Sequence, residues 1–245
     1  MLRKPSLLLA LLILSLLSTA HAAALRLATL EYPPYCSQAL PGGGSIVELV
    51  TRAFATQGHP VQIDFMPWAR VRAELHTGRY QGALPLWPRE INEERLTASR
   101  PLFYSELGFF SRSGQPVSFT TLDNLKGRRV GLVRGYGYPP SLFKHGFIGE
   151  EAVDDLTNLR KLAGRRFDLV LLERVVGAYL TARHTELRGR VAWQEPALER
   201  IPLLVGFLPP KNGEPDWAAI FEQGLRALHA SGDYMRILQK NSAQP

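Results

Sequence analysis

The sequence has a single cysteine, Cys36, and lacks the residue patterns of metal and nucleotide sites. One cysteine cannot form an internal disulfide, so hydrophobic burial must supply the stability of the fold. We interpret Cys36 as a small buried hydrophobic residue. The histidines are far apart, and none pairs with another His, Cys or acidic residue at a metal-ligand spacing. No G-x-S-x-G, P-loop or H-E-x-x-H motif is present. We therefore expect no metal and no cofactor.

Long apolar runs are also missing, except for one at residues 7–17. Arg3 and Lys4 precede this run, and Ala20-His21-Ala22 follows it with the small-x-small pattern of a cleavage site. This arrangement is typical of a secretory signal peptide. A membrane-spanning helix is the alternative, but it needs ~20 apolar residues. We predict cleavage after Ala22, no lipid anchor, and a soluble mature protein in the periplasm.

The charge of the chain gives little indication of a partner. Removal of Arg3 and Lys4 with the leader lowers the formal net charge from +7 to +5. The basic residues are scattered, so we interpret the charge as a solubility feature and expect no nucleic acid partner. A mature chain of this size can form one large domain or two small ones.

Predicted strands and helices alternate along the mature sequence. The apolar patterns predict strands at 25–30, 61–65, 82–86, 129–133, 167–172 and 203–208, and helices at 45–57, 69–76, 122–125, 141–144, 158–163, 175–182, 217–228 and 234–238. This alternation predicts an α/β fold with a mostly parallel sheet. Two runs of ~90 residues indicate two lobes, and the last ~40 residues return to one of them.

Several segments, in this order, resemble the type II periplasmic solute-binding proteins of family 3, which serve polar amino acid ABC importers. The most specific are LDNLKGRRVGL (122–132) and the closing FEQGLRALHASGDYM (221–235). Further similar segments are 27–35, which ends in YPPY, 44–54, 65–70, which reads FMPWAR, 75–82, 99–102 and 162–168. The resemblance covers nearly all of the mature chain.

The resemblance implies a two-lobed periplasmic-binding-protein-like fold with two hinge crossovers, near 106–110 and 199–204. The implied division is a signal peptide at 1–22, the first part of lobe 1 at 23–105, the hinge and lobe 2 at 106–204, and a return to lobe 1 at 205–245. The implied function is capture of a small polar solute, an amino acid or related zwitterion, by hinge closure. The partner would be an ABC transporter permease in the inner membrane, and the protein would be a monomer that performs no chemistry.

The family's ligand contacts can be carried over to two charged residues. An arginine fork suits the carboxylate of an amino acid, and an acid suits its ammonium. The family takes its arginine from the segment that holds Arg95, with Arg89 as the rival; a solvent-exposed arginine is the alternative. The family's acid lies five residues after an aspartate of the family pattern that corresponds to Asp168. In this sequence that position is Glu173. The alternative for Glu173 is a charge that complements the N-terminus of the following helix.

Aromatic residues should form the walls of the cleft. Tyr35, Trp68, Trp87 and Tyr104 fall in segments that face the cleft in this family, and aromatic rings offer apolar contact with a polar edge. Core packing is the alternative for each of them.

Two positions depart from the family pattern. Gln81 stands where the family usually has Asp, and Tyr136-Gly137 stands where amino acid binders place hydroxyls that hold the ligand carboxylate. Loss of these hydroxyls and gain of a tyrosine indicate a ligand of different shape, with Tyr136 as a ligand contact.

Two other functions remain as alternatives. Periplasmic dehydratases of the cyclohexadienyl or arogenate type resemble the same family, and a desolvated Glu173 would be their general acid. The third reading is a sensing module that reports ligand occupancy to a separate membrane partner.

Overall fold

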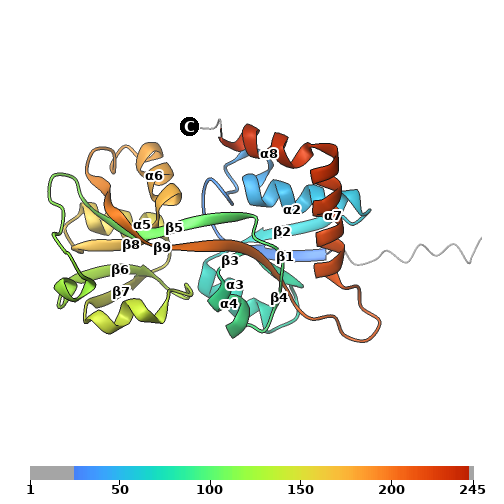
Figure 1. Cartoon of the computed structure of the whole chain (residues 1–245), viewed down its shortest axis with the longest axis horizontal. Coiled ribbons are helices and arrows are strands. Elements are labelled where there is room, and N and C mark those ends of the chain that lie inside the picture. Colours follow the sequence, from blue (N-terminus) through green and yellow to red (C-terminus); the bar gives the residue numbers. More distant parts are fainter. Residues whose placement is uncertain (1–24, 243–245) are drawn as a thin grey trace, which may run out of the picture.

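The computed structural model describes residues 25–242, which form two α/β lobes joined by two long strands (Figure 1). The predicted signal peptide lies outside the described residues. The strands are β1 (Leu25–Thr29), β2 (Val61–Phe65), β3 (Gly82–Leu86), β4 (Thr97–Ala98), β5 (Phe103–Arg112), β6 (Arg129–Val133), β7 (Ile148–Ala152), β8 (Leu169–Glu173) and β9 (Val191–Phe207). The helices are α2 (Ser45–Thr56), α3 (Trp68–Leu75), α4 (Pro88–Glu93), α5 (Asp155–Ala163), α6 (Arg174–Arg183), α7 (Trp217–Ser231) and α8 (Asp233–Ser242), with short 3₁₀ turns η1 (Pro41–Gly43), η2 (Leu122–Leu125) and η3 (Pro140–His145).

The strands follow the order β2-β1-β3-β9-β5-β8-β6-β7, and β4 pairs with β9. In lobe 1, β1 runs parallel to both β2 and β3; in lobe 2, β6 runs parallel to both β7 and β8. The expected α/β fold with two lobes is therefore confirmed. None of the described helices is long and apolar enough to cross a membrane.

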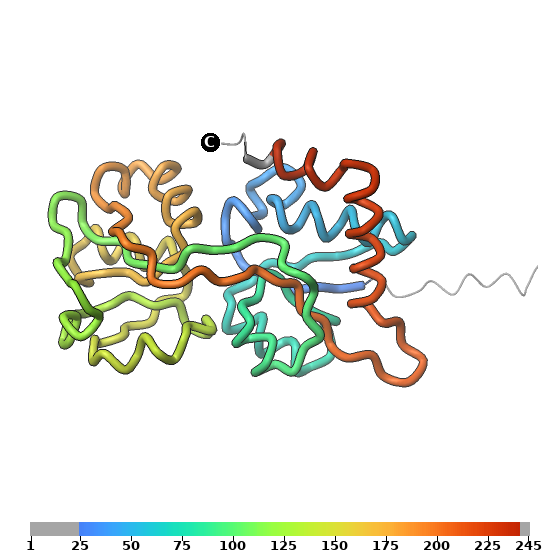
Figure 2. Tube along the Cα trace, in the orientation of Figure 1, coloured from blue at the N-terminus to red at the C-terminus, as the bar shows by residue number. Residues whose placement is uncertain are grey.

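Two antiparallel strands, β5 and β9, carry the chain between the lobes (Figure 2). Their pairing runs from Phe103 opposite Leu203 to Arg112 opposite Val191, with an irregularity between Leu107 and Phe109. The predicted crossovers, 106–110 and 199–204, lie within these two strands. The sequence pattern predicted only the last part of β9, and no strand at 103–112.

Lobe 1 is held together by α2 and α7, which pack against each other and against the sheet (Figure 1). The ring of Phe54 in α2 stacks on Phe221 in α7 at a centroid distance of 5.5 Å. A Cβ on Gly224 would lie only 2.1 Å from the carbonyl oxygen of Ala53, so the glycine allows the two helices to approach this closely. The apolar face that the sequence predicted for α2 is thus the core of the lobe.

Two strands of the central sheet, β3 and β8, are buried along their whole length. Every residue of β3 and of β8 is buried, as expected for parallel strands with helices on both faces. In open α/β sheets, side chains that follow the carboxyl ends of such strands meet at a crevice. This geometry brings the segments after β1, β3 and β6 to one place between the lobes.

Candidate functional site

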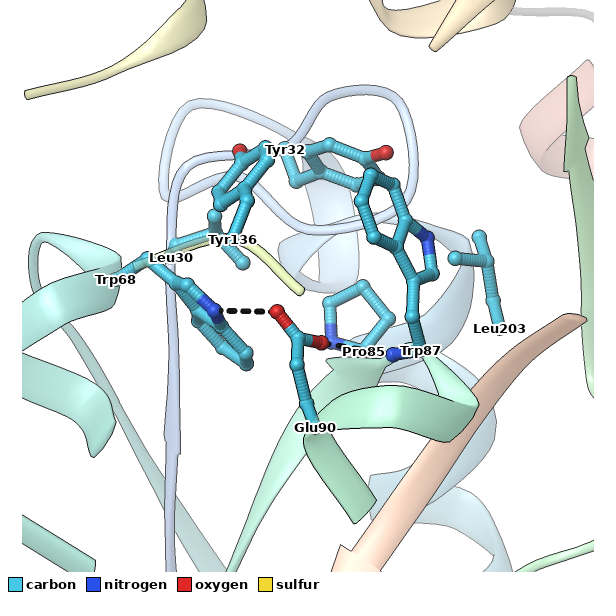
Figure 3. Close-up of a pocket in the computed structure, with 8 residues that line it drawn as sticks. All are labelled: Leu30, Tyr32, Trp68, Pro85, Trp87, Glu90, Tyr136 and Leu203. Carbon is cyan, nitrogen blue, oxygen red and sulfur yellow. Dashed lines mark hydrogen bonds between the residues drawn. The ribbon is translucent and has the colours of Figure 1, made fainter. Parts of the chain in front are cut away.

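A small cavity lies between the lobes, and its walls come from both of them (Figure 3). It is lined by Leu30, Tyr32, Trp68, Pro85, Trp87, Glu90, Tyr136 and Leu203. Its volume of about 20 Å³ leaves room for roughly one water molecule. The lobes therefore touch at this point, and side chains of both fill most of the space around the cavity.

The ring of Tyr136, from lobe 2, is inserted among three rings of lobe 1, which we call the aromatic cage: Tyr32, Trp68 and Trp87. The ring of Tyr136 meets these at centroid distances of 6.2, 6.5 and 5.6 Å and at interplanar angles of 77°, 86° and 75°. Such T-shaped pairs place the positive edge of one ring against the negative face of another. The aromatic contact is thus a main attraction between the lobes at this point.

Glu90 places a carboxylate at the base of the cavity. It is the third residue of α4, which begins with Pro88 directly after β3, and its side chain is only 3% exposed. Oε1 accepts hydrogen bonds from Trp68 Nε1 and from the Gly137 backbone N–H, and Oε2 accepts one from the Trp87 N–H, each at 2.8 Å. Figure 3 shows the carboxylate pointing toward Trp68. Burial raises the pKa of Glu90 to about 7, although these hydrogen bonds oppose the shift.

Lobe 2 contributes a second buried carboxylate, Asp155, in the first turn of α5. Its side chain is 2% exposed, and Oδ2 accepts a hydrogen bond of 2.7 Å from the Tyr136 hydroxyl. No described residue donates to Oδ1 of Asp155 or pairs with the buried hydroxyl of Tyr32. Burial raises the pKa of Asp155 to about 7, with further contributions from the charges of Asp154 and Glu173.

Glu173 is the third buried carboxylate, at the end of β8 and 1% exposed. Oε2 caps α6 by accepting a hydrogen bond of 2.6 Å from the Val176 N–H, so the helix-capping alternative for this residue is observed. No described residue lies in hydrogen-bonding geometry to donate to Oε1. Tyr35 lies close to this carboxylate: burial raises the pKa of the Tyr35 hydroxyl most, and the charge of Glu173 raises it further. Burial also raises the pKa of Glu173 to about 7.

These three acids have no basic partner. Among residues 25–240, no Lys, Arg or His is buried, and none forms an ion pair with Glu90, Asp155 or Glu173. Buried carboxylates are normally paired or neutralised by a raised pKa. The protein therefore supplies no counter-charge to these acids, and a cation bound beside them would stabilise their ionised form.

The outer rim of the cleft is held by arginines. Arg72 in α3 donates from Nη1 to the Gly135 carbonyl of lobe 2 at 3.0 Å and pairs with Glu93 and Glu94 of lobe 1. Arg89 donates from Nη1 to the Tyr138 carbonyl of lobe 2 at 2.6 Å. Both guanidinium groups thus link lobe 1 to backbone oxygens of lobe 2.

Beyond the cavity, the cleft opens into two wider grooves. One has a volume of about 170 Å³ and includes Glu31, Trp68, Tyr136 and Asp154. The other, of about 690 Å³, is lined by the 31–41 segment of lobe 1 and by α5 and α6 of lobe 2. Because the first groove shares Trp68 and Tyr136 with the cavity, it leads directly to the aromatic cage.

Five of the predicted ligand contacts lie together at or beside the cavity. Trp68, Trp87 and Tyr136 line it, while Tyr35 stacks on Tyr32 at 5.9 Å and lies near Glu173. These residues remain predicted contacts, and the structure brings them to one place.

Two of the predicted contacts lie elsewhere. Tyr104 is 48% exposed on β5, where the Arg200 guanidinium covers its ring at 3.9 Å. Arg95 is exposed in the turn after α4, with a φ of 53°, and it lines none of the cavities described here. Its rival Arg89 bridges the lobes at the rim. The structure therefore places no arginine at the cavity.

Sequence reasoning missed Tyr32, Glu90 and Asp155. Tyr32 belongs to the YPPY segment, in which Tyr35 was preferred. Glu90 follows Pro88 at a spacing typical of a helix start, and Asp155 follows the capping residue Asp154. Because acidic residues are common in first helical turns, this signal alone does not distinguish a site from a helix cap.

Within residues 25–242, no group of three or more His, Cys, Asp or Glu side chains is arranged to hold a metal ion. Cys36 is buried, as predicted, and burial raises the pKa of its thiol to about 12.

The fold is shared with known ligand-binding domains. No family model matches the sequence, and no curated protein does. Among solved structures, the GluR0 ligand-binding core from Nostoc punctiforme in complex with L-glutamate is 21% identical, with a TM-score of 0.71 over 88% of this chain and 98% of that one. An ancestral arginine-binding protein bound to arginine is 18% identical, with a TM-score of 0.74 over 89% and 97%. A histidine kinase sensor domain with similarity to periplasmic binding proteins is 23% identical, with a TM-score of 0.75 over 89% and 95%. The chain therefore has the two-lobed, type II periplasmic-binding-protein fold.

Proposed function

We propose that this protein is a periplasmic solute-binding protein that captures a small polar solute bearing a protonated amine, as an amino acid or related zwitterion does, and delivers it to an ABC importer. The observation that carries the proposal is the buried interlobe cavity, which takes aromatic rings from both lobes and the carboxylate of Glu90 from lobe 1, while Asp155 of lobe 2 accepts the hydroxyl of its Tyr136 ring. A solute that contacts both lobes binds fully only in the closed state, so it shifts the equilibrium between open and closed conformations.

The hinge in this proposal lies in the two crossing strands, near 106–110 and 199–204. Residues 23–105 and 205–245 then move as lobe 1 against the rest of the chain. The rim contacts of Arg72 and Arg89 are to backbone oxygens, so they can form and break without a change of partner side chain. The protein acts as a monomer and performs no chemistry on the solute.

The proposal is tested by a thermal-shift screen of residues 23–245 against amino acids, polyamines, small organic acids and sugars. A solute at 100 times its dissociation constant stabilises the folded protein by ~2.7 kcal/mol, which raises the melting temperature by a few degrees. Small-angle scattering with each hit should show a decrease in the radius of gyration. Hits that leave the radius unchanged, or a screen without hits, would contradict solute capture by closure.

A sensor role is a second candidate, because one of the similar structures is a histidine kinase sensor domain. Closure around a solute would be the same in both roles, but only the transport role predicts solute uptake. Deletion of the gene should therefore abolish uptake of the identified solute. Normal uptake with a lost transcriptional response to the solute would favour the sensor.

The enzyme alternative is tested separately, because buried acids with a pKa near 7 can act as general acids. Incubation with prephenate or arogenate is expected to yield no product. Product formation that is lost in the Glu173→Gln variant would establish the dehydratase reading instead.

A further inference from the structure

We infer that the cleft recognises an organic cation, an alkylammonium group that carries no carboxylate beside it, in the aromatic cage of Tyr32, Trp68 and Trp87 above Glu90. This inference rests on the proposed function and narrows its solute class. It departs from the zwitterion that the resemblance implies.

The first support is the geometry of the aromatic cage. Three rings of lobe 1 surround the cavity, and a fourth, that of Tyr136, enters it from lobe 2 at 5.6–6.5 Å. The faces of Trp and Tyr rings attract ammonium groups within about 6 Å, and cages of several such rings are used to bind alkylated ammonium ions. An apolar neutral solute would gain nothing from the carboxylate of Glu90 at the base of the cavity.

The second support is the unmatched negative charge. Glu90, Asp155 and Glu173 are each at most 3% exposed, and none has a basic partner among the described residues. Leaving a buried acceptor without a donor destabilises the folded protein. Oδ1 of Asp155, on the carboxylate that accepts the Tyr136 hydroxyl, has no donor among the described residues, so this side of the cleft favours a ligand that brings positive charge or N–H donors.

The third support concerns the carboxylate that an amino acid would bring. The arginines nearest the cavity, Arg72 and Arg89, already bond to Glu93 and to lobe 2 carbonyls. None of the residues that line the cavity is basic, and it already contains Glu90. A ligand carboxylate inside it would lie beside Glu90 with no basic side chain among the lining residues to pair with, and among their unpaired polar groups only the Tyr32 hydroxyl could donate to it.

Basic residues do occur in the larger outer groove, at Arg183 and His184. The Arg183 guanidinium lies over the Tyr179 ring at 5.5 Å, and His184 lies 3.7 Å from Glu186. Both are at the end of α6, and neither lines the cavity or the groove next to it. They do not provide the missing carboxylate partner at the aromatic cage.

The size of the cavity sets how the ligand enters. Since about 20 Å³ holds only one water molecule, an alkylammonium must occupy space that opens when lobe 2 moves away. The ring of Tyr136 fills that space in the closed protein. On binding, the ligand takes the position of this ring, and Tyr136 becomes the outer wall of the cage.

The test is isothermal titration calorimetry of the mature protein with matched solutes. Choline and putrescine are compared with 3,3-dimethylbutan-1-ol, the neutral isostere of choline, and with glycine betaine, which adds a carboxylate to the same head group. We expect at least one cation to bind. We also expect the neutral isostere and betaine to bind at least about tenfold more weakly than choline if choline is that cation. The inference is overturned if betaine, the neutral isostere or L-glutamate binds more tightly than both choline and putrescine.

Variants locate the site. Trp87→Leu and Glu90→Gln should each weaken binding of the cation at least about tenfold, while Trp217→Leu, on the far side of lobe 1 against Phe54, should leave it unchanged. If Glu90→Gln fails to fold, Trp87→Leu alone still decides the location. Equal affinities in all three variants would place the ligand elsewhere and contradict the inference.

The two proposals fail differently. If no cation binds at 10 mM but another class of solute contracts the protein in the scattering experiment, the cation inference is wrong and the solute-binding function stands. If a cation binds at the aromatic cage without any contraction, the site is correct and the transport proposal is wrong.

Discussion

The inner cavity and the outer rim of the cleft use opposite kinds of side chains to hold the lobes together. Inside, aromatic rings and buried carboxylates meet without a basic residue; at the rim, Arg72 and Arg89 bond to carbonyl oxygens across the gap. The rim contacts are partly solvated and replaceable by water, so they can open at little cost. The comparison indicates that guanidinium groups of this protein link the lobes at the rim, whereas aromatic rings and acids line the interior, where we propose that the ligand binds.

The largest effect is expected from removing an aromatic wall. Trp68→Ala deletes a side chain that is 2% exposed and leaves Glu90 without one of its donors. Such truncations lower the free energy of unfolding by about 3–5 kcal/mol. Urea denaturation measures the change, with Arg89→Ala as the rim control. Equal losses for both variants would show that the cavity and the rim contribute alike.

The next effect is a pH dependence that comes from the cavity. The pKa values of Glu90, Asp155 and Glu173 are each raised to about 7 in the folded protein, above their usual values near 4. Groups with raised pKa values stabilise the fold below their unfolded pKa, and this stability is lost as the pH rises through 7. Together they should lower the free energy of unfolding by at least about 3 kcal/mol between pH 4.5 and 8.

Neighbouring groups act on the size of this pH dependence in both directions. The charge of Arg72 and three N–H donors oppose the shift at Glu90, whereas Asp154 raises the pKa of Asp155 and Glu106 that of Glu173. Thermal unfolding measured at each pH, with Glu90→Gln for comparison, checks the prediction. A wild-type profile that is flat or rises from pH 5 to 8 would exclude the burial argument.

A smaller effect is expected at the rim itself. Arg72→Ala removes one of two partners of Glu94, whose side chain is only 4% exposed and also lies 2.9 Å from His76, and it removes one bond to lobe 2. We expect a loss of about 1–3 kcal/mol in the free energy of unfolding. Arg89→Ala, at a side chain that is 42% exposed, should cost no more than about 1 kcal/mol. Urea denaturation of both variants should show the larger loss for Arg72→Ala. A larger loss for Arg89→Ala would mean that Arg89 contributes more to the stability of the rim.

The smallest effect is expected at Arg95, the arginine that the family pattern favours. Its side chain is exposed and lines none of the cavities described here, so Arg95→Ala should change the free energy of unfolding by less than about 0.5 kcal/mol and leave ligand affinity unchanged. Titration calorimetry with the identified solute tests this. A tenfold loss of affinity would restore the carboxylate contact that the sequence predicts.

Local patterns predicted most of the regular elements. The apolar runs at β3 and β8 and the helical spacing in α2 matched the structure, because each depends on neighbours a few residues away. The two crossing strands were only partly predicted. Pro196 and Pro202 are untypical of a strand and obscure the sequence pattern of β9. The pairing of β9 with β5 joins residues about a hundred positions apart, which no local pattern reports.

For the site, the sequence by itself determined which kinds of residue gather at the cleft. Trp68, Trp87 and Tyr136 follow strands or begin helices, and parallel strands carry such positions to one edge of the sheet. Only the tertiary structure decided which of these residues meet. The angle between the lobes inserts Tyr136 into the aromatic cage, and that angle depends on long-range packing of β5, β9 and the rim contacts, and not on any single segment. Arg95 stays in solvent because it lies in the exposed turn after α4.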